Sequence, residues 1–155
     1  MLFETQEQQD ERFMRIALQE AAQAAEEDEI PVGAVIVQDG QLIARAHNLT
    51  ERLRDVTAHA EMQAITSAAM TLGGKYLQGC TLYVTVEPCP MCAGAIGWAQ
   101  VARIVWATSD PKRGYTSLTP PTGPHSPLHP KAVVTAGVLA DQARELMQSF
   151  FRTRR

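Results

Sequence analysis

The sequence has few of the features that mark secreted or membrane-embedded chains. Its 155 residues contain only three cysteines, and no apolar run approaches the roughly 20 residues that span a bilayer. The first residues are acidic and amide-rich and lack the basic start and apolar stretch of a signal peptide. We therefore expect a cytoplasmic protein whose cysteines are metal ligands or core thiols rather than disulfide partners.

The composition gives no indication of disorder or of a fibrous repeat. Hydrophobic residues make up 45% and charged residues 20% of the chain, close to the average for globular domains. A chain of this length can bury a core without disulfides. Because no repeat or linker interrupts the sequence, we expect a single domain over residues 1–155.

Charge is distributed unevenly along the chain. The formal net charge of −3 argues weakly against a nucleic-acid partner. However, residues 1–102 carry 6 Lys/Arg and 14 Asp/Glu, a net −8, whereas residues 103–155 carry 8 Lys/Arg and 3 Asp/Glu, a net +5. If phosphates are bound, we expect the contacts in the last third. A solvated basic surface explains the charge equally well.

Hydrophobic periodicity predicts a mixed sheet sandwiched by helices. Asp39-Gly40 is typical of a hairpin turn between the first two strands, and the later strands alternate with helices, which implies parallel pairing. The expected helices cover residues 6–27, 58–71, 89–99 and 138–153, and the expected strands cover residues 31–37, 42–44, 81–86, 103–106 and 132–135. Six prolines exclude regular structure from most of residues 110–131.

Two short motifs carry the chemistry, and each lies where a predicted helix begins. They are Thr-Ala-His-Ala-Glu at residues 57–61 and Glu-Pro-Cys-Pro-Met-Cys at residues 87–92. If the strands are parallel, both helix starts meet at the carboxyl edge of one sheet, where α/β folds place their ligands. The two motifs are therefore predicted to form one site.

The cysteines of the second motif have the spacing of a metal-ligand pair. Cys89 and Cys92 project on the same side of a helix start, whose unpaired N–H groups favour thiolates. His59 adds an imidazole nitrogen, and the combined donor set suits zinc. Three protein ligands leave a fourth position for water, which indicates a catalytic rather than a structural site.

Glu61 makes this metal site a deaminase hypothesis. Deamination needs one group that carries protons from the attacking water to a ring nitrogen and to the leaving amine. Two residues along a regular helix correspond to a rotation of about 200°, which would point His59 and Glu61 apart. We therefore expect His59 to lie in an irregular first turn.

Each of these residues also has a simpler interpretation. The cysteine pair alone could be a redox pair, and His59 alone could be a core or capping residue. Glu61 could be a fourth ligand that closes the site of a zinc-stabilised binding module. Their joint occurrence favours catalysis, because His-x-Glu followed by Pro-Cys-x-x-Cys is the signature of zinc nucleobase deaminases.

With these motifs the sequence resembles the cytidine deaminase superfamily and, within it, the bacterial tRNA-specific adenosine deaminases, which convert an anticodon wobble adenosine to inosine. The similarity runs from about residue 12 to residue 155 and includes Pro-Val-Gly-Ala-Val at 31–35, Met-Cys-Ala-Gly-Ala at 91–95 and Phe-Phe-Arg at 150–152. The resemblance implies an α/β fold, a three-layer α/β/α sandwich with a central five-stranded mixed sheet. It also implies homodimers whose active sites are completed by the neighbouring subunit.

The resemblance also implies roles for individual residues. His59, Cys89 and Cys92 would hold one Zn²⁺ per chain, and Glu61 would be the catalytic proton shuttle. Asn48 would hydrogen-bond the flipped nucleoside of the RNA substrate. The other substrate positions are Ala60 and Pro88 in the base pocket and Asp110 and Lys112 beside the neighbouring nucleotides.

The carboxyl end contributes further candidate RNA contacts, since it combines positive charge with aromatic stacking surface. These candidates are Phe150, Phe151, Arg152, Arg154 and Arg155. An idle basic tail is the alternative interpretation.

The loop at residues 115–131 is richer in proline than is usual in the family. Of the basic, histidine-containing stretch that is typical of the family here, this chain has only His125, His129 and Lys131. The substrate is therefore less determined than the reaction, and a deaminase of free bases such as guanine or cytosine is the alternative. Three conspicuous residues are expected in the core: Cys80, Trp98 and Trp106.

Overall fold

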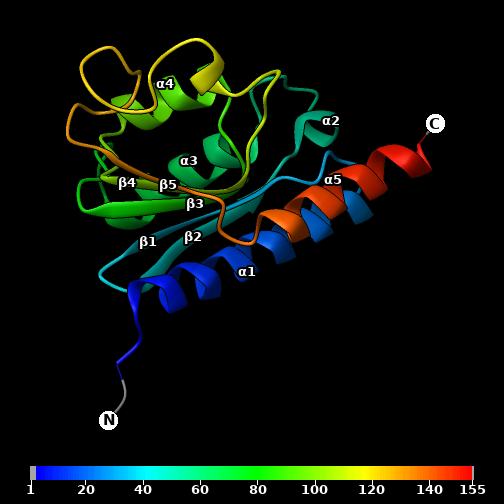
Figure 1. Cartoon of the computed structure of the whole chain (residues 1–155), viewed down its shortest axis with the longest axis horizontal. Helices are drawn as coiled ribbons and strands as arrows, with labels where there is room; N and C mark the ends of the chain where they lie inside the picture. Colours follow the sequence, from blue (N-terminus) through cyan, green and yellow to red (C-terminus); the bar gives the residue numbers. More distant parts are fainter. Residues whose placement is uncertain (1–2, 155) are drawn as a thin grey trace.

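The β-branched runs of the chain pair into one sheet. The computed structural model describes residues 3–154, and its five strands follow the order β2-β1-β3-β4-β5 (Figure 1). They are β1 (Gly33–Gln38), β2 (Gln41–His47), β3 (Cys80–Val86), β4 (Arg103–Thr108) and β5 (Val133–Ala136). β1 is antiparallel to β2 and β3, whereas β3, β4 and β5 are parallel, so the predicted mixed sheet is confirmed.

Strand direction places the ends of three strands at one edge. β2 and β3 run the same way because both are antiparallel to β1, and β4 runs with β3. The segments that follow β2, β3 and β4 therefore leave the sheet at the same edge. Between β1 and β2, Asp39 and Gly40 both have positive φ, 51° and 74°, as the predicted hairpin turn requires.

Helices cover both faces of the sheet, which confirms the three-layer arrangement. α1 and α5 lie on one face, and α3 and α4 lie on the other (Figure 1). The short α2, which was not predicted, lies in the polar segment between β2 and α3. The helices are α1 (Gln6–Glu26), α2 (Thr50–Leu53), α3 (Ala60–Leu72), α4 (Pro90–Trp98) and α5 (Ala140–Thr153).

The alternation of side chains along the strands divides the core between the two faces. Ile36, Leu82 and Ile104 point toward α3 and α4. Their neighbours in the chain, Val35, Tyr83 and Val105, point toward α1 and α5. Cys80 is fully buried in the first of these clusters, as expected of a core thiol.

A buried ion pair attaches α1 to the sheet. The Asp10 carboxylate is 3% exposed and accepts hydrogen bonds from both terminal nitrogens of Arg103, at 2.7 and 2.6 Å. It also accepts one from the Tyr83 hydroxyl at 2.8 Å. A charge buried in this way is stable only with such partners, so the network fixes α1 relative to β3 and β4.

The proline-rich segment after β4 contains one short 3₁₀ turn, η1 (Tyr115–Ser117), within the described chain. The Tyr115 hydroxyl and the Ser126 hydroxyl both donate to the Pro121 carbonyl, at 2.8 and 3.1 Å. The segment then passes directly over α4, where a Cβ at Gly97 would overlap with the Pro127 carbonyl oxygen. Gly97 is therefore needed for this close approach.

The expectation for one of the two tryptophans was wrong. Trp106 is buried, at 3% exposure, but Trp98 at the end of α4 is 85% exposed. All residues of α4 are small or apolar, so the pattern does not indicate which side of the helix faces the sheet. Among residues 3–154, no helix combines the length and the apolar character needed to cross a membrane.

Candidate metal centre and active site

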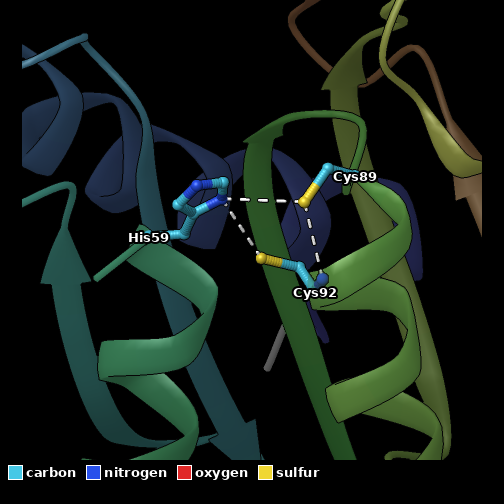
Figure 2. Close-up of side chains that lie close together, drawn as sticks. All are labelled: His59, Cys89 and Cys92. Atoms are coloured by element: carbon cyan, nitrogen blue, oxygen red, sulfur yellow. Dashed lines mark hydrogen bonds between the residues drawn. The ribbon is translucent and has the colours of Figure 1, made fainter. Parts of the chain in front are cut away.

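The three predicted metal ligands meet at the carboxyl edge of the sheet. His59 is the residue before α3, Cys89 is the N-cap of α4, and Cys92 lies in the first turn of α4. The His59 Nδ1 atom is 3.7 Å from Cys89 Sγ and 3.4 Å from Cys92 Sγ (Figure 2). All three ligand atoms lie within 4.8 Å of one another.

These distances fit a zinc ion. With Zn–S near 2.3 Å and Zn–N near 2.0–2.1 Å, tetrahedral geometry separates a sulfur and a nitrogen ligand by about 3.6 Å. The observed separations of 3.7 and 3.4 Å lie on either side of this value. Within residues 3–154 the group comprises His59, Cys89 and Cys92 without Glu61, so a fourth protein ligand is not indicated.

The electrostatics of the two thiols favour a cation between them. Hydrogen bonding from the Cys92 thiol lowers the pKa of Cys89 to about 4, and His59 and the Cys92 backbone N–H contribute further. The same hydrogen bond, together with burial, raises the pKa of Cys92 far above its ordinary value. A divalent cation would allow both to be thiolates.

Glu61 is buried in the first turn of α3 and is 3% exposed. The predicted irregularity is present, because His59 is extended, with φ −69° and ψ 158°, and precedes the helix. Burial raises the pKa of Glu61 to about 7, and the nearby charge of Cys89 adds to this effect. A carboxyl group with such a pKa can both accept and donate protons near neutral pH.

The residues expected to contact the base lie next to these groups in the chain. Ala60 follows His59 and Pro88 precedes Cys89, and both are buried. Asn48 leaves β2 at the same edge and is 6% exposed. Its amide already has two backbone partners, since Nδ2 donates to the Ile30 carbonyl at 3.4 Å and Oδ1 accepts from the Thr50 N–H at 3.2 Å.

Asp110 and Lys112 follow β4, also at this edge. The Asp110 carboxylate closes a turn, because its Oδ1 accepts the backbone N–H groups of Lys112 at 3.1 Å and Arg113 at 3.0 Å. The side chains of Lys112 and Arg113 are exposed. From the sequence, Lys112 was named as a candidate contact but Arg113, the second exposed cation of this turn, was not.

The candidate RNA contacts of α5 lie in the other helical layer. Phe150 is 8% exposed, and the Arg154 guanidinium lies 3.8 Å from its ring centroid while pairing with Asp28 at 2.7 Å. Arg152 pairs with Glu145 at 3.1 Å. Phe150 and Arg154 thus attach the end of α5 to the protein, whereas Phe151 is 46% exposed. Arg155 lies outside the described residues.

Two buried carboxylates near the edge were given no role in the sequence analysis, although Glu87 opens the second motif. Glu29 is fully buried and accepts the backbone N–H groups of Glu51 and Arg52 in α2, at 2.9 and 2.8 Å. Glu87 is 5% exposed and accepts hydrogen bonds from the segment after β4. Glutamates are almost always exposed unless they have partners, and the chain alone does not identify the partners.

Comparisons with known proteins agree with this geometry. Residues 7–108 match the family model described as the cytidine and deoxycytidylate deaminase zinc-binding region. A tRNA-specific adenosine deaminase from Bacillus subtilis (strain 168) is 44% identical over 144 residues, which cover 93% of this chain and 89% of that protein.

Two solved structures are similar to different extents. One comes from studies of A-to-I editing by tRNA:A34 deaminases at the wobble position of transfer RNA. It has a TM-score of 0.79 and 42% identity, and the match covers 87% of this chain and 98% of that one. A guanine deaminase from Bacillus subtilis has a TM-score of 0.61 and 42% identity, with 64% of each chain covered.

Proposed function

Because the chain belongs to the cytidine and deoxycytidylate deaminase family, we propose that it is a zinc-dependent hydrolase that converts adenosine to inosine in RNA, at the wobble position of a tRNA anticodon. One observation carries the proposal: a buried carboxyl group, Glu61, lies beside three convergent zinc-type donors. Support for the RNA substrate comes from the relative that acts on tRNA adenosine, which is 44% identical over 93% of this chain.

In this proposal His59, Cys89 and Cys92 hold the zinc ion and Glu61 moves the protons. When bound, Zn²⁺ acts as a Lewis acid and makes water nucleophilic at neutral pH. Glu61 accepts one proton from the attacking water and delivers it to a ring nitrogen. It then accepts the remaining proton of the hydroxyl group added to the ring carbon and delivers it to the exocyclic amine, which leaves as ammonia. The net reaction consumes one water and places oxygen at C6 of the adenine.

The proposal assigns recognition to the residues around this centre. Ala60 and Pro88 border the base, and Asn48 hydrogen-bonds the nucleoside. Lys112 lies where a neighbouring phosphate would pass, because it is exposed at the same sheet edge. A single-stranded anticodon loop suits such a site, since its bases can be splayed out toward the metal. Residues 1–155 would act as one domain, in the cytoplasm.

The test is a substrate assay with the purified zinc-loaded protein. We expect inosine in anticodon stem-loops that carry a wobble adenosine and no turnover of free guanine or cytosine. Salt must be stated and kept constant, because phosphate contacts weaken steeply as it rises. Turnover of a free base without inosine in the RNA would replace this proposal by the alternative, a deaminase of free bases. The similarity to a guanine deaminase is the observation that supports this alternative.

A single substitution separates catalysis from zinc binding. Glu61→Gln keeps the shape of the side chain but removes its ability to take and deliver protons. We expect zinc content to stay at one per chain and kcat to fall by about 10²–10⁴-fold. Loss of zinc in this variant would instead mean that Glu61 is a ligand, which would favour the structural interpretation.

We also propose that the protein forms a homodimer through the outer side of α4. Met91 and Trp98 lie on the same face of α4, about two turns apart, and are 37% and 85% exposed. Gly94 lies between them, where a side chain would meet only open space. α4 has no charged residue, unlike a helix that faces water. A second copy, with the same apolar stripe, is a self-complementary partner.

Sedimentation at micromolar concentration tests the dimer. Trp98→Arg should give a folded monomer, because the side chain contributes little to packing within its own chain. Phe3→Arg, at a site of 81% exposure in the segment before α1, is the matched control and should remain dimeric. A monomeric native protein, or a dimer that tolerates Trp98→Arg, would contradict this arrangement.

A further inference from the structure

Glu87 joins the second metal motif to the segment that follows β4. Its Oε1 accepts the backbone N–H of Asp110 at 3.2 Å, and its Oε2 accepts both the backbone N–H of Thr116, at 3.0 Å, and the Thr116 hydroxyl, at 2.7 Å. Glu87 lies two residues before Cys89 and is 5% exposed. One buried carboxylate therefore holds both ends of residues 110–116, which we call the cationic loop.

Backbone bonds on either side make this attachment close. The Glu87 N–H donates to the Thr108 carbonyl at 2.9 Å, and the Tyr115 N–H donates to the Pro88 carbonyl at 2.9 Å. A Cβ at Gly114 would overlap with the Glu87 carboxylate, so glycine alone leaves room for it there. The cationic loop is thus packed directly against the residues that lead to Cys89.

The middle of the cationic loop carries two positive charges that do not pair with Glu87. The Asp110 side chain is occupied by the backbone of the turn, through Lys112 and Arg113 N–H groups at 3.1 and 3.0 Å. The side chains of Lys112 and Arg113 extend into solvent. Two adjacent exposed cations at the edge that holds the metal donors suit the phosphates of a single-stranded nucleic acid.

We propose that Glu87 is a positioning residue that sets the distance between the metal centre and the phosphate-binding cations Lys112 and Arg113. This inference rests on the proposed function, since it assumes an RNA substrate. Glu87 does not touch the reacting atoms. Its role is to fix where the RNA backbone runs relative to the base in the site, and so to discriminate RNA from free bases.

The donor pattern shows why a carboxylate is needed here. All three groups that face Glu87 are N–H or O–H donors, and each carboxylate oxygen has at least one of them. A glutamine in either orientation would direct its own N–H₂ group at a backbone donor. Glu87→Gln therefore conserves volume but disrupts one end of the cationic loop.

The experiment compares steady-state kinetics of the native protein and Glu87→Gln on an anticodon stem-loop. We expect KM to rise about tenfold with kcat within about twofold, as for the loss of a hydrogen bond to a charged group. The salt dependence of RNA binding should also flatten, because phosphate contacts are lost. A purely structural role would change thermal stability or zinc content without changing the salt slope.

Two further variants keep the test decisive if Glu87→Gln folds poorly. Thr116→Val removes only the hydroxyl bond at an exposed position, and we expect KM to rise about threefold. Glu11→Gln, an exposed glutamate on α1, is the matched control and should behave as the native protein. A fall in kcat at unchanged KM in Thr116→Val would overturn the inference.

Coupling to the cations is the final criterion. If Glu87 acts through Lys112 and Arg113, then Glu87→Gln should have little effect on KM once both cations are alanines. If Glu87→Gln raised KM by the same factor with and without the two cations, the effects would be independent and the proposal would be overturned. An inactive native protein refutes the proposed function, whereas an active native protein with a normal Glu87→Gln variant refutes only the role of Glu87.

Discussion

The two helical layers of this protein meet solvent in different ways. α1 and α5 have charged outer sides with ion pairs such as Arg15–Glu11 and Arg144–Asp141. α3 has one charged residue, the buried Glu61, and α4 has none. Both metal-binding motifs, and the exposed Trp98, belong to the second layer.

The difference indicates that the two layers have different roles. The outer side of the α1/α5 layer faces solvent, and its inner side holds the buried Asp10–Arg103 ion pair. We therefore assign this layer a role in stabilising the fold. The α3/α4 layer places metal donors at its helix starts and leaves an apolar outer side, which is typical of a surface that another molecule covers. Substitutions in the two layers should therefore affect different measurements.

The largest effect is expected at a metal ligand. Cys92→Ala removes one of three donors, so we expect loss of zinc and a fall of activity to background, measured by metal analysis and by inosine formation. Cys80→Ala is the matched control, because Cys80 is as fully buried as Cys92 but lies outside the donor group. It should keep zinc and turnover; loss of zinc in both variants would contradict the assignment.

The next largest effect is expected on stability, in the opposite layer. Asp10→Ala leaves Arg103 without its buried partner, and we expect the free energy of unfolding to fall by about 3–5 kcal/mol. Activity per folded molecule should stay unchanged at a temperature where the variant is folded. Chemical denaturation and the inosine assay measure the two; a selective fall in kcat would show that the layers are not independent.

The pKa of Asp10 determines how this stabilisation depends on pH. Burial raises the pKa of Asp10, but hydrogen bonds from Arg103 and Tyr83 outweigh burial and leave the pKa below its ordinary value. Its contribution is therefore present at neutral pH and is lost as pH falls through the lowered pKa. The difference in unfolding free energy between native protein and Asp10→Ala should shrink in acid, and a constant difference would contradict the ion pair.

The smallest effect is expected at the outer surface of α1. Arg15 and Glu11 form an exposed pair at 3.3 Å, one helical turn apart. Arg15→Ala should change the unfolding free energy by no more than about 0.5 kcal/mol, because exposed pairs are weak and screened by salt. Thermal melts at low and high salt measure this; a larger loss would show that the charged surface of α1 is more than a solvated face.

Local pattern was enough for most of the fold and for the metal donors. The hairpin at Asp39-Gly40 and the parallel strands follow from turn chemistry and from the alternation of strands and helices. His59 could be matched with Cys89 and Cys92 because both motifs lie at helix starts, and parallel strands bring such starts to one edge. The departure of His59 from regular helix followed from the rotation per residue together with the premise that His59 and Glu61 serve one site.

The sequence by itself determined the order of the main helices and strands and the zinc-type donors, and it singled out Glu61 as the candidate proton carrier, because these depend on periodicity and on chemically distinctive residues close together in the chain. Tertiary structure decided the exposure of Trp98 and the partners of Glu87, since an all-apolar helix encodes no outward face and a buried carboxylate is satisfied by donors from a distant segment. Burial and long-range hydrogen bonds are properties of the folded chain, and the spacing of residues along the sequence predicts neither.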